Sequence, residues 1–372
     1  MRRWFAMVAA VALGACGEDP EGAASAPATL QLVSVDTVPD PGGRTIGRFS
    51  KLLIAKDSTM YLPIQYANHV LHLNGNGRLI RRIGRHGSGP GEFSSSPNSL
   101  VEWGDTLAFV NLATRQVALF HRADGRYLTR FTVGGFPYTL AATPDRLFVG
   151  ALSMGSGTVA GIVERGDTVM RPIIPTPAVW QATPIALRRW PVTLVAAASE
   201  HVVVGMPANP WLFVASHAGE LVDSFTVPAV RRRAIPADID RQLEPVVQSR
   251  LAFLLFAQLT AVETRADGLE LTVHQDWFSS DTTDRPSIDG ERITDELRAY
   301  ASFIDRANRR ACVDTPIPVD WASLPAAISS HGNDIIVFGH VDDGSEIPAV
   351  ELRRYRVDLS RCGWMPLGAP PS

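Results

Sequence analysis

Residues 99–128 read SLVEWGDTLAFVNLATRQVALFHRADGRYL and contain two successive hairpin patterns. The first pattern spans 99–110 and turns at Gly104-Asp105, and the second spans 117–128 and turns at Asp124-Gly125. Asx-Gly pairs permit the positive φ angles of tight hairpins, and alternating apolar residues bury one face of each strand. The stretch therefore predicts a unit of four antiparallel strands.

The same unit recurs along the chain, and an acidic residue marks its first turn, ahead of a strongly apolar strand. These turn residues are Asp57, Asp105, Asp145, Glu200, Asp267 and Asp334. Four-stranded units repeated at such intervals are typical of β-propellers, in which each unit forms one blade. We therefore predict an all-β fold, a six-bladed β-propeller of four-stranded antiparallel blades.

Three further segments fit around these repeats. The strand at 30–35 precedes the first unit, and we predict that it pairs with the last blade and closes the ring. Apolar residues at mixed helical spacing in 234–262 predict a short helical insertion between blades four and five. Residues 279–294 are predicted to form a polar loop.

The amino terminus carries an export pattern. Arg2 and Arg3 precede the apolar run 4–13, which is too short to span a bilayer comfortably. The run ends in Leu13-Gly14-Ala15-Cys16, which resembles the lipobox of bacterial lipoproteins. That resemblance implies cleavage before Cys16 and acylation of its thiol. The predicted organisation is a signal peptide at 1–15, a lipidated flexible tether at 16–28 and the propeller at 29–372.

The outer strand of the first unit is followed by Gly89-Pro90-Gly91-Glu92-Phe93. With the repeats, this motif resembles the bacterial six-bladed β-propeller lipoproteins related to NHL-repeat and TolB-like propellers. No lysine follows the glycines, so the run does not match a phosphate-binding loop. We expect an inter-blade crossover in which Phe93 fills a packing gap, while Arg85, His86 and Glu92 face a possible ligand.

Export changes the interpretation of the two remaining cysteines. Cys312 and Cys362 would lie in an oxidising compartment, where a structural disulfide is favoured over two free thiols. We therefore predict that they are bridged. Three cysteines in all are too few for a four-thiolate zinc site.

No catalytic constellation is evident in the sequence, and neither a metal site nor a cofactor is predicted. The formal net charge of −3 and a pI near 6.3 argue against a nucleic-acid binder. Arg231-Arg232-Arg233 is a compact cationic patch. We interpret it as a solvated loop that is a candidate for recognising an anionic partner.

These observations predict an extracytoplasmic propeller, anchored in a bacterial membrane through acylated Cys16. Its expected role is to bind or scaffold an envelope protein or a small extracellular ligand. The alternative is a hydrolase or lyase, similar to propeller lactonases, with its site in the central channel. A propeller fold alone does not choose between them, because propellers host both kinds of function.

Overall fold

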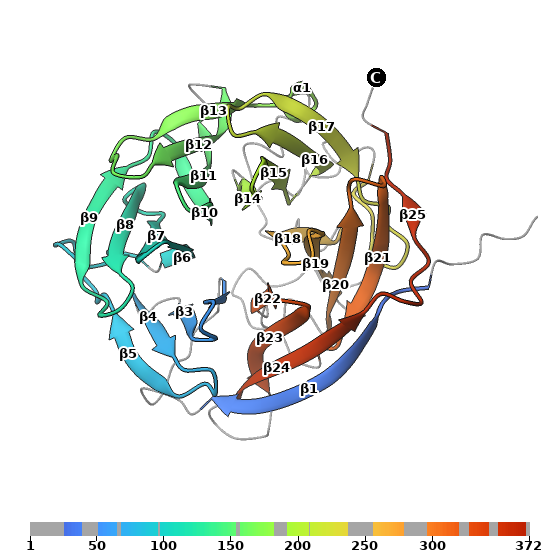
Figure 1. Ribbon diagram of the computed structural model, residues 1–372, viewed down its shortest axis with the longest axis horizontal. Helices are drawn as coiled ribbons and strands as arrows, with labels where there is room; N and C mark the ends of the chain where they lie inside the picture. The colour runs from blue at the N-terminus through green and yellow to red at the C-terminus, as the bar shows by residue number, and fades with distance from the viewer. Residues whose placement is uncertain are drawn as a thin grey trace, which may run out of the picture.

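The computed structural model of the chain describes residues 26–38, 51–64, 68–95, 97–153, 157–181, 192–207, 209–236, 256–278, 296–319, 327–341 and 349–369. Within these residues, six antiparallel sheets are arranged radially around a central axis (Figure 1). The predicted six-bladed propeller is therefore confirmed. In blades 1–5 the strands follow one another outward from the axis in chain order, whereas in blade 6 the outermost strand is the first strand of the chain (Figure 1).

The first three blades each consist of two successive hairpins. Blade 1 comprises β2 (Leu53–Ile54), β3 (Met60–Ile64), β4 (His69–Leu73) and β5 (Leu79–Ile83). Blade 2 comprises β6 (Pro97–Trp103), β7 (Thr106–Asn111), β8 (Gln116–His121) and β9 (Tyr127–Thr132). Blade 3 comprises β10 (Phe136–Ala142), β11 (Arg146–Ser153), β12 (Thr158–Glu164) and β13 (Arg171–Pro175).

The last three blades keep the hairpin pattern with two modifications. Blade 4 comprises β14 (Leu194–Ala197), β15 (His201–Met206), β16 (Asn209–Ser216) and β17 (Leu221–Thr226). Blade 5 comprises β18 (Gln258–Thr264), β19 (Glu270–Phe278), β20 (Glu296–Asp305) and β21 (Arg310–Ile317), with β25 (Met365–Pro366) added at its outer edge. Blade 6 comprises β22 (Ala327–His331), β23 (Asp334–Val341), β24 (Ala349–Asp358) and β1 (Thr29–Val38).

The first strand in the chain closes the ring, as predicted from the sequence. β1 pairs antiparallel with β24, from Thr29 opposite Asp358 to Val38 opposite Val350. The sixth blade is thus built from both ends of the propeller sequence. Closing a ring in this way leaves each sheet with only a short outer edge.

The insertions agree less completely with the sequence. Residues 237–255, where the helical insertion was expected, lie outside the described residues, as does the predicted polar loop. The end of the expected insertion, 258–262, belongs instead to β18. A short helix that the sequence did not indicate, α1 (Ala178–Gln181), follows blade 3 and buries Trp180 edge-on against Phe213. No helix in the described ranges is long and apolar enough to cross a bilayer.

Apolar packing fills every junction between neighbouring blades. Six clusters of buried side chains are present, and each contains residues of two adjacent blades. In the cluster between blades 1 and 2, Phe93, Phe109 and Phe120 lie with ring centroids 5.3–5.9 Å apart. Both faces of each sheet are therefore buried, which explains why the strands read as nearly continuous apolar runs.

Side-chain hydrogen bonds connect the inner strands of adjacent blades. The Ser99 hydroxyl oxygen on β6 accepts the N–H of Leu140 on β10 at 3.2 Å. At the corresponding place one blade later, the Thr139 hydroxyl accepts the N–H of Val195 at 3.0 Å and donates to the Thr193 carbonyl at 2.6 Å. These hydroxyl groups satisfy backbone groups that the sheet ladders leave unpaired at the centre of the ring.

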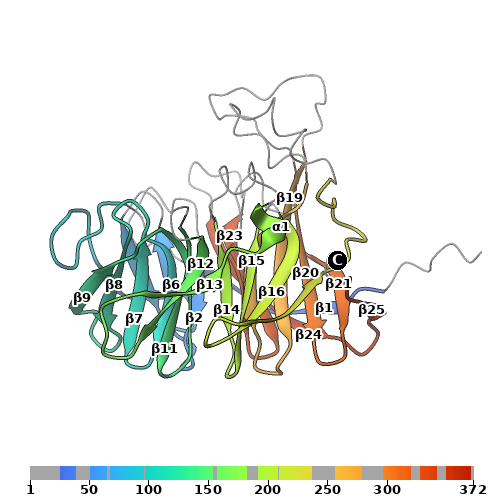
Figure 2. The same cartoon turned by 90° about the horizontal axis from the view of Figure 1, so that it is seen from above.

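The turns inside the two hairpins of every blade share one face of the ring, which we call the turn face. The connections between hairpins and between blades lie on the opposite face, which we call the loop face. Figure 2 shows the strands running between the two faces, with α1 at the loop face. This division follows from the sequential antiparallel strand order.

Charged residues on the turn face pair across blade junctions at a repeated position. In each of blades 2–5, the residue directly after the third strand contacts the preceding blade. These four residues are Arg122, Arg165, His217 and Arg306. For example, Arg165 donates to Asp105 at 2.9 Å. Such half-exposed pairs each contribute under about 1 kcal/mol. Two of the predicted turn acids, Asp57 and Asp105, are engaged in these contacts.

The predicted disulfide between Cys312 and Cys362 is confirmed, with Cα atoms 5.9 Å apart. Cys312 is fully buried in β21, and Cys362 lies in the segment after β24. The bridge therefore joins blade 5 to the end of blade 6. Beside it, the N–H of Gly363 donates to the Ala26 carbonyl at 2.9 Å, which holds the start of β1 at the same place.

We expect the variant Cys312→Ser/Cys362→Ser to be less stable than the wild type. The bridge closes a loop with a sequence separation of 50 residues. Because the cross-link lowers the conformational entropy of the unfolded chain, a loop of this length is expected to contribute about 4 kcal/mol of stabilisation. Urea denaturation of both proteins measures the difference, and equal midpoints would contradict this role of the bridge.

We expect Thr139→Val to destabilise the protein by about 1–3 kcal/mol, because it removes a hydroxyl that serves two buried backbone groups. The valine keeps the side-chain shape, so the loss reports on the hydrogen bonds. Thr129→Val, at a half-buried position in the outer strand β9, is the control. Thermal denaturation should separate the two variants, and equal melting temperatures would argue against the inter-blade bonds.

Candidate functional site

The loop between blades 1 and 2 is held together by its own predicted site residues. Glu92 accepts hydrogen bonds from the Gly89 N–H and from Arg85 Nε, both at 2.8 Å. These two donors lower the pKa of the Glu92 carboxyl, with the backbone bond from Gly89 as the larger cause. The structure thus brings Arg85 and Glu92 together, but the carboxylate already serves the loop.

The neighbouring residues of this loop have packing roles. His86 contacts the Asn68 side chain at 2.5 Å, away from the Arg85–Glu92 pair. Phe93 is fully buried, as the sequence predicted. Gly84 adopts a φ of 75°, and a Cβ atom there would lie 2.2 Å from the Phe93 ring. Glycine is therefore required for the chain to pass over this aromatic core.

The predicted cationic patch lies in a different setting from the one that the sequence suggested. Asp314, fully buried on β21, accepts the N–H groups of Val230, Arg231 and Arg232 at 2.6, 2.8 and 3.3 Å. The Arg232 guanidinium also pairs with the same carboxylate and is itself only 6% exposed. For Arg232, the prediction of a solvated loop is wrong, because three backbone donors and a buried carboxylate hold it inside the protein.

Local backbone geometry explains how Asp314 reaches the connection between blades 4 and 5. The register between β20 and β21 shifts between Ala301 and Phe303, and Asp314 adopts a φ of 51° within this irregularity. Its N–H donates to the Ser302 hydroxyl at 3.1 Å. Bulges of this kind redirect a side chain out of the regular strand pattern. Here the redirected side chain is a carboxylate that binds the incoming loop.

A second buried carboxylate holds Arg233. Asp276 on β19 is fully buried and accepts the Arg233 N–H at 3.2 Å and Arg233 Nε at 2.7 Å. Arg232 and Arg233 are thus each matched by one acid of blade 5. The arginine run is primarily an anchor for the connection between blades 4 and 5, and its two acids come from strands distant in sequence.

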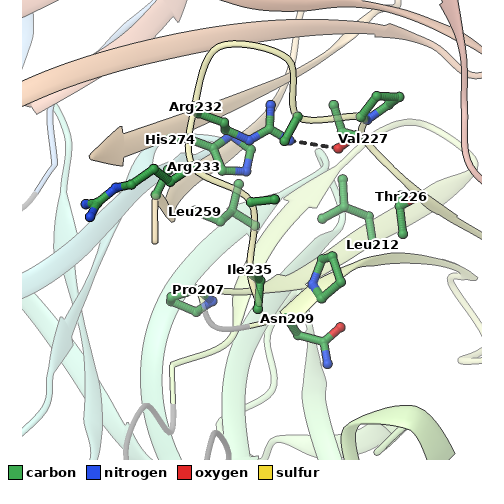
Figure 3. Close-up of a pocket in the computed structure, with 15 residues that line it drawn as sticks. Pro207, Asn209, Leu212, Thr226, Val227, Arg232, Arg233, Ile235, Leu259 and His274 are labelled. Atoms are coloured by element: carbon green, nitrogen blue, oxygen red, sulfur yellow. Dashed lines mark hydrogen bonds between the residues drawn. The ribbon is translucent and has the colours of Figure 1, made fainter. Parts of the chain in front are cut away.

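This anchored connection covers a cavity between blades 4 and 5 on the loop face. Its volume is about 240 Å³. The walls are mostly apolar and include Pro207, Leu212, Leu259 and Ile235, as Figure 3 shows. Arg232 lies at one end beside His274, and a bond of 2.7 Å from Arg232 to the Val227 carbonyl fixes its position. None of the loop 85–93 lines this cavity.

His274 on β19 is the titratable side chain in this cavity that the sequence analysis missed. Burial holds its pKa well below the ordinary value, and the Arg232 cation contributes in the same direction. Its Nδ1 atom is buried and has no hydrogen-bond partner among the described residues. This atom has less than 1 Å² of accessible surface, so it is shielded from the cavity as well as from solvent.

The described residues contain no group of three or more His, Cys, Asp or Glu side chains that could hold a metal ion. The inner strands that line the channel bear the hydroxyl groups of Ser99 and Thr139, and these are engaged in inter-blade bonds. Within the part of the chain that the structure describes, the cavity between blades 4 and 5 is accordingly the strongest candidate site.

Known proteins of similar structure share the fold at low sequence identity. A DUF4221-family protein of Bacteroides vulgatus is 7% identical with a TM-score of 0.61, covering 89% of this chain and 99% of its own. A Bacteroides fragilis protein described as a putative exported protein is 11% identical with a TM-score of 0.55, and the match covers 88% of this chain and 95% of that protein. Virginiamycin B lyase of Staphylococcus aureus is 10% identical with a TM-score of 0.50, and the match covers 87% of this chain and 99% of the lyase. No protein-family model and no curated protein sequence matches the chain.

We expect the environment of His274 to make stability depend on pH. Its folded-state pKa lies below the unfolded value of about 6.5. The unfolded state therefore binds more protons, so stability is fully present above about pH 6.5 and is lost as the pH falls through the folded-state pKa. The loss is at most about 1.4 kcal/mol per pH unit for one proton.

Urea denaturation between pH 7.5 and 5.5 should show a smaller pH slope for His274→Gln than for the wild type. Arg232 and Arg233, which line the same cavity, and their partners Asp314 and Asp276 remain unchanged in the variant. His121→Gln, on the turn face and outside the cavity, is measured as the control. Identical slopes for all three proteins would contradict the assignment.

Proposed function

We propose that the protein is an extracytoplasmic binding module, anchored to a bacterial membrane through acylated Cys16, and that it binds through its loop face. This proposal includes the relation to NHL-like and TolB-like propeller lipoproteins. It combines the lipobox-like residues at 13–16, which lie outside the described residues, with the geometry of the propeller. The alternative is a hydrolase or lyase with its site in the central channel, and no group of three or more His, Cys, Asp or Glu side chains that could hold a metal ion is present among the described residues.

The disulfide supports an extracytoplasmic location. Cys312 and Cys362 are bridged, and structural disulfides persist mainly in oxidising compartments such as the periplasm and the cell surface. An exported chain also fits the short apolar run that precedes Cys16. Lipidation would provide durable attachment, because two or more acyl chains hold a protein where one gives only reversible binding.

The observation that carries the binding role is the preformed cavity between blades 4 and 5. Ligand sites are concave and mostly apolar, with a few polar groups in defined positions. This cavity has apolar walls, and the buried pairs Arg232–Asp314 and Arg233–Asp276 hold its cover in place. On the turn face, by contrast, Arg122 pairs with Asp57 and Arg165 with Asp105 of the preceding blade. The loop face is therefore the face better suited to recognition.

We expect full-length protein in a bacterial host to incorporate an alkyne fatty acid, and Cys16→Ser to lose that label. The matched control is Cys312→Ser/Cys362→Ser, which keeps the acceptor thiol and should remain labelled. Gel fluorescence after click coupling gives the readout. Labelling of Cys16→Ser at the wild-type level would contradict the proposed anchor.

The binding role is tested on the same protein after detergent solubilisation of the envelope. Native mass spectrometry should detect a bound ligand or partner that is retained in the turn-face variant Arg165→Gln and lost in Leu259→Trp, which fills the cavity. Circular dichroism confirms that both variants are folded. Recovery of wild-type protein alone, without any bound species, would count against a binding module.

A further inference from the structure

The outer strand of blade 6 carries an exposed apolar patch. Leu32, Val33 and Val35, in the middle of β1, are 56%, 48% and 47% exposed. We call these three residues the rim patch. β1 is the outermost strand of its blade, so the rim patch lies on the circumference of the ring (Figure 1). Single exposed apolar residues are common on soluble proteins, but a contiguous group is typical of an interaction surface.

A β-bulge produces this patch. Before the bulge, Leu30 packs against the cluster between blades 5 and 6, and after it, Val38 is buried in the cluster between blades 6 and 1. Residues 30 and 38 would share one face of a regular strand. The ladder with β24 shifts register directly after Leu32, and Val33 is the extra residue, so the faces are exchanged beyond it. Leu32 and Val35 therefore lie on the same face of the blade, with Val33 between them.

The same bulge argues against another β-strand as the occupant of the rim patch. Pairing with a further strand needs an uninterrupted row of backbone N–H and C=O groups along the edge of β1, and a bulge disrupts this row. The residue opposite Val35 is Arg353, whose charge is compensated by Glu351 at 2.9 Å. The rim patch is therefore suited to an apolar surface that its side chains can enter, as in a lipid bilayer.

The position of the chain start points to the membrane as the occupant. The Ala26 carbonyl accepts the Gly363 N–H at 2.9 Å, which fixes the start of the described chain beside the disulfide. Cys16 precedes Ala26 by ten residues, and ten residues span at most about 36 Å. Leu32 follows Ala26 by six residues, which is about 20 Å along an extended strand. An acyl anchor on Cys16 thus keeps the bilayer surface within reach of the rim patch.

Resting on the proposed function, with its anchor at Cys16, we propose that the rim patch is a second membrane contact. Leu32, Val33 and Val35 enter the interfacial region of a lipid bilayer. The contact is shallow, because the free backbone groups along the edge of β1 must stay in contact with water or lipid headgroups. The ring then stands with its rim against the membrane, and both its turn face and its loop face stay accessible.

Fluorescence quenching by brominated phosphatidylcholine tests this contact on the acylated protein, made from the full chain and reconstituted into vesicles. Leu32→Trp places an additional indole in the rim patch. The matched control is Leu128→Trp, because Leu128 is 39% exposed on the outer strand β9, which lies across the ring from the start of β1 (Figure 1). After subtraction of the wild-type signal, we expect bromine at interfacial depth to quench the added indole of Leu32→Trp at least about twice as strongly as that of the control.

A further variant separates the rim patch from the anchor. Val33→Ser/Val35→Ser, introduced beside Leu32→Trp, keeps acylated Cys16, so the protein remains on the vesicles. Its quenching should fall to the level of Leu128→Trp, because the apolar neighbours that drive the contact are removed. Circular dichroism confirms folding, and Val35→Trp replaces Leu32→Trp if the latter does not fold. Quenching that is unchanged by the two serines would overturn the proposal.

The outcomes also separate this contact from its alternatives. Equal quenching of Leu32→Trp and Leu128→Trp, in protein that carries the alkyne label, would overturn the rim contact and leave the anchor standing. Absence of the label from the wild type would overturn the anchor, and the rim contact with it. A wild-type dimer in native mass spectrometry that Val33→Ser/Val35→Ser converts to a monomer would overturn the membrane contact in favour of a second copy of this chain.

Discussion

The pairing of β1 with β24 is the constraint on which the rest of the structure depends. Six sheets bury both of their faces only if the ring is closed, because an open ring would expose the apolar faces of two blades. The closing strand comes from the opposite end of the propeller sequence, with Thr29 opposite Asp358. Every inter-blade contact, including the bond between Thr139 and Val195, depends on this closed geometry.

Closure also gives the two faces of the ring different structures. The short turns of one face hold residues such as Arg165 and Asp105, which link neighbouring blades. The opposite face carries the longer connections, and one of them covers the cavity next to His274. Buried acids rather than surface charges hold this cover, so its position is determined by the core of blade 5.

The sequence was informative where the structure is local. Turn acids such as Asp57 and Asp334 mark hairpins within a few residues of one another, and each hairpin forms as predicted. The arginine run was misread because its partners are not local. Asp314 lies 82 residues after Arg232, and its carboxylate faces the loop only because of a shift in strand register. His274-Gln275-Asp276, three successive polar residues in the middle of β19, were the available signal for the site.

The arrangement around the disulfide has a mechanical consequence. Ala26, at the start of the described chain, is bound by Gly363, the residue next to the bridged Cys362. Tension applied from the amino-terminal side would reach this contact before it reaches the ladder between β1 and β24. Since the bridge connects Cys362 covalently to β21 in blade 5, part of the load passes into a second sheet. The strand that closes the ring is thereby shielded from being peeled away by a force on its own end.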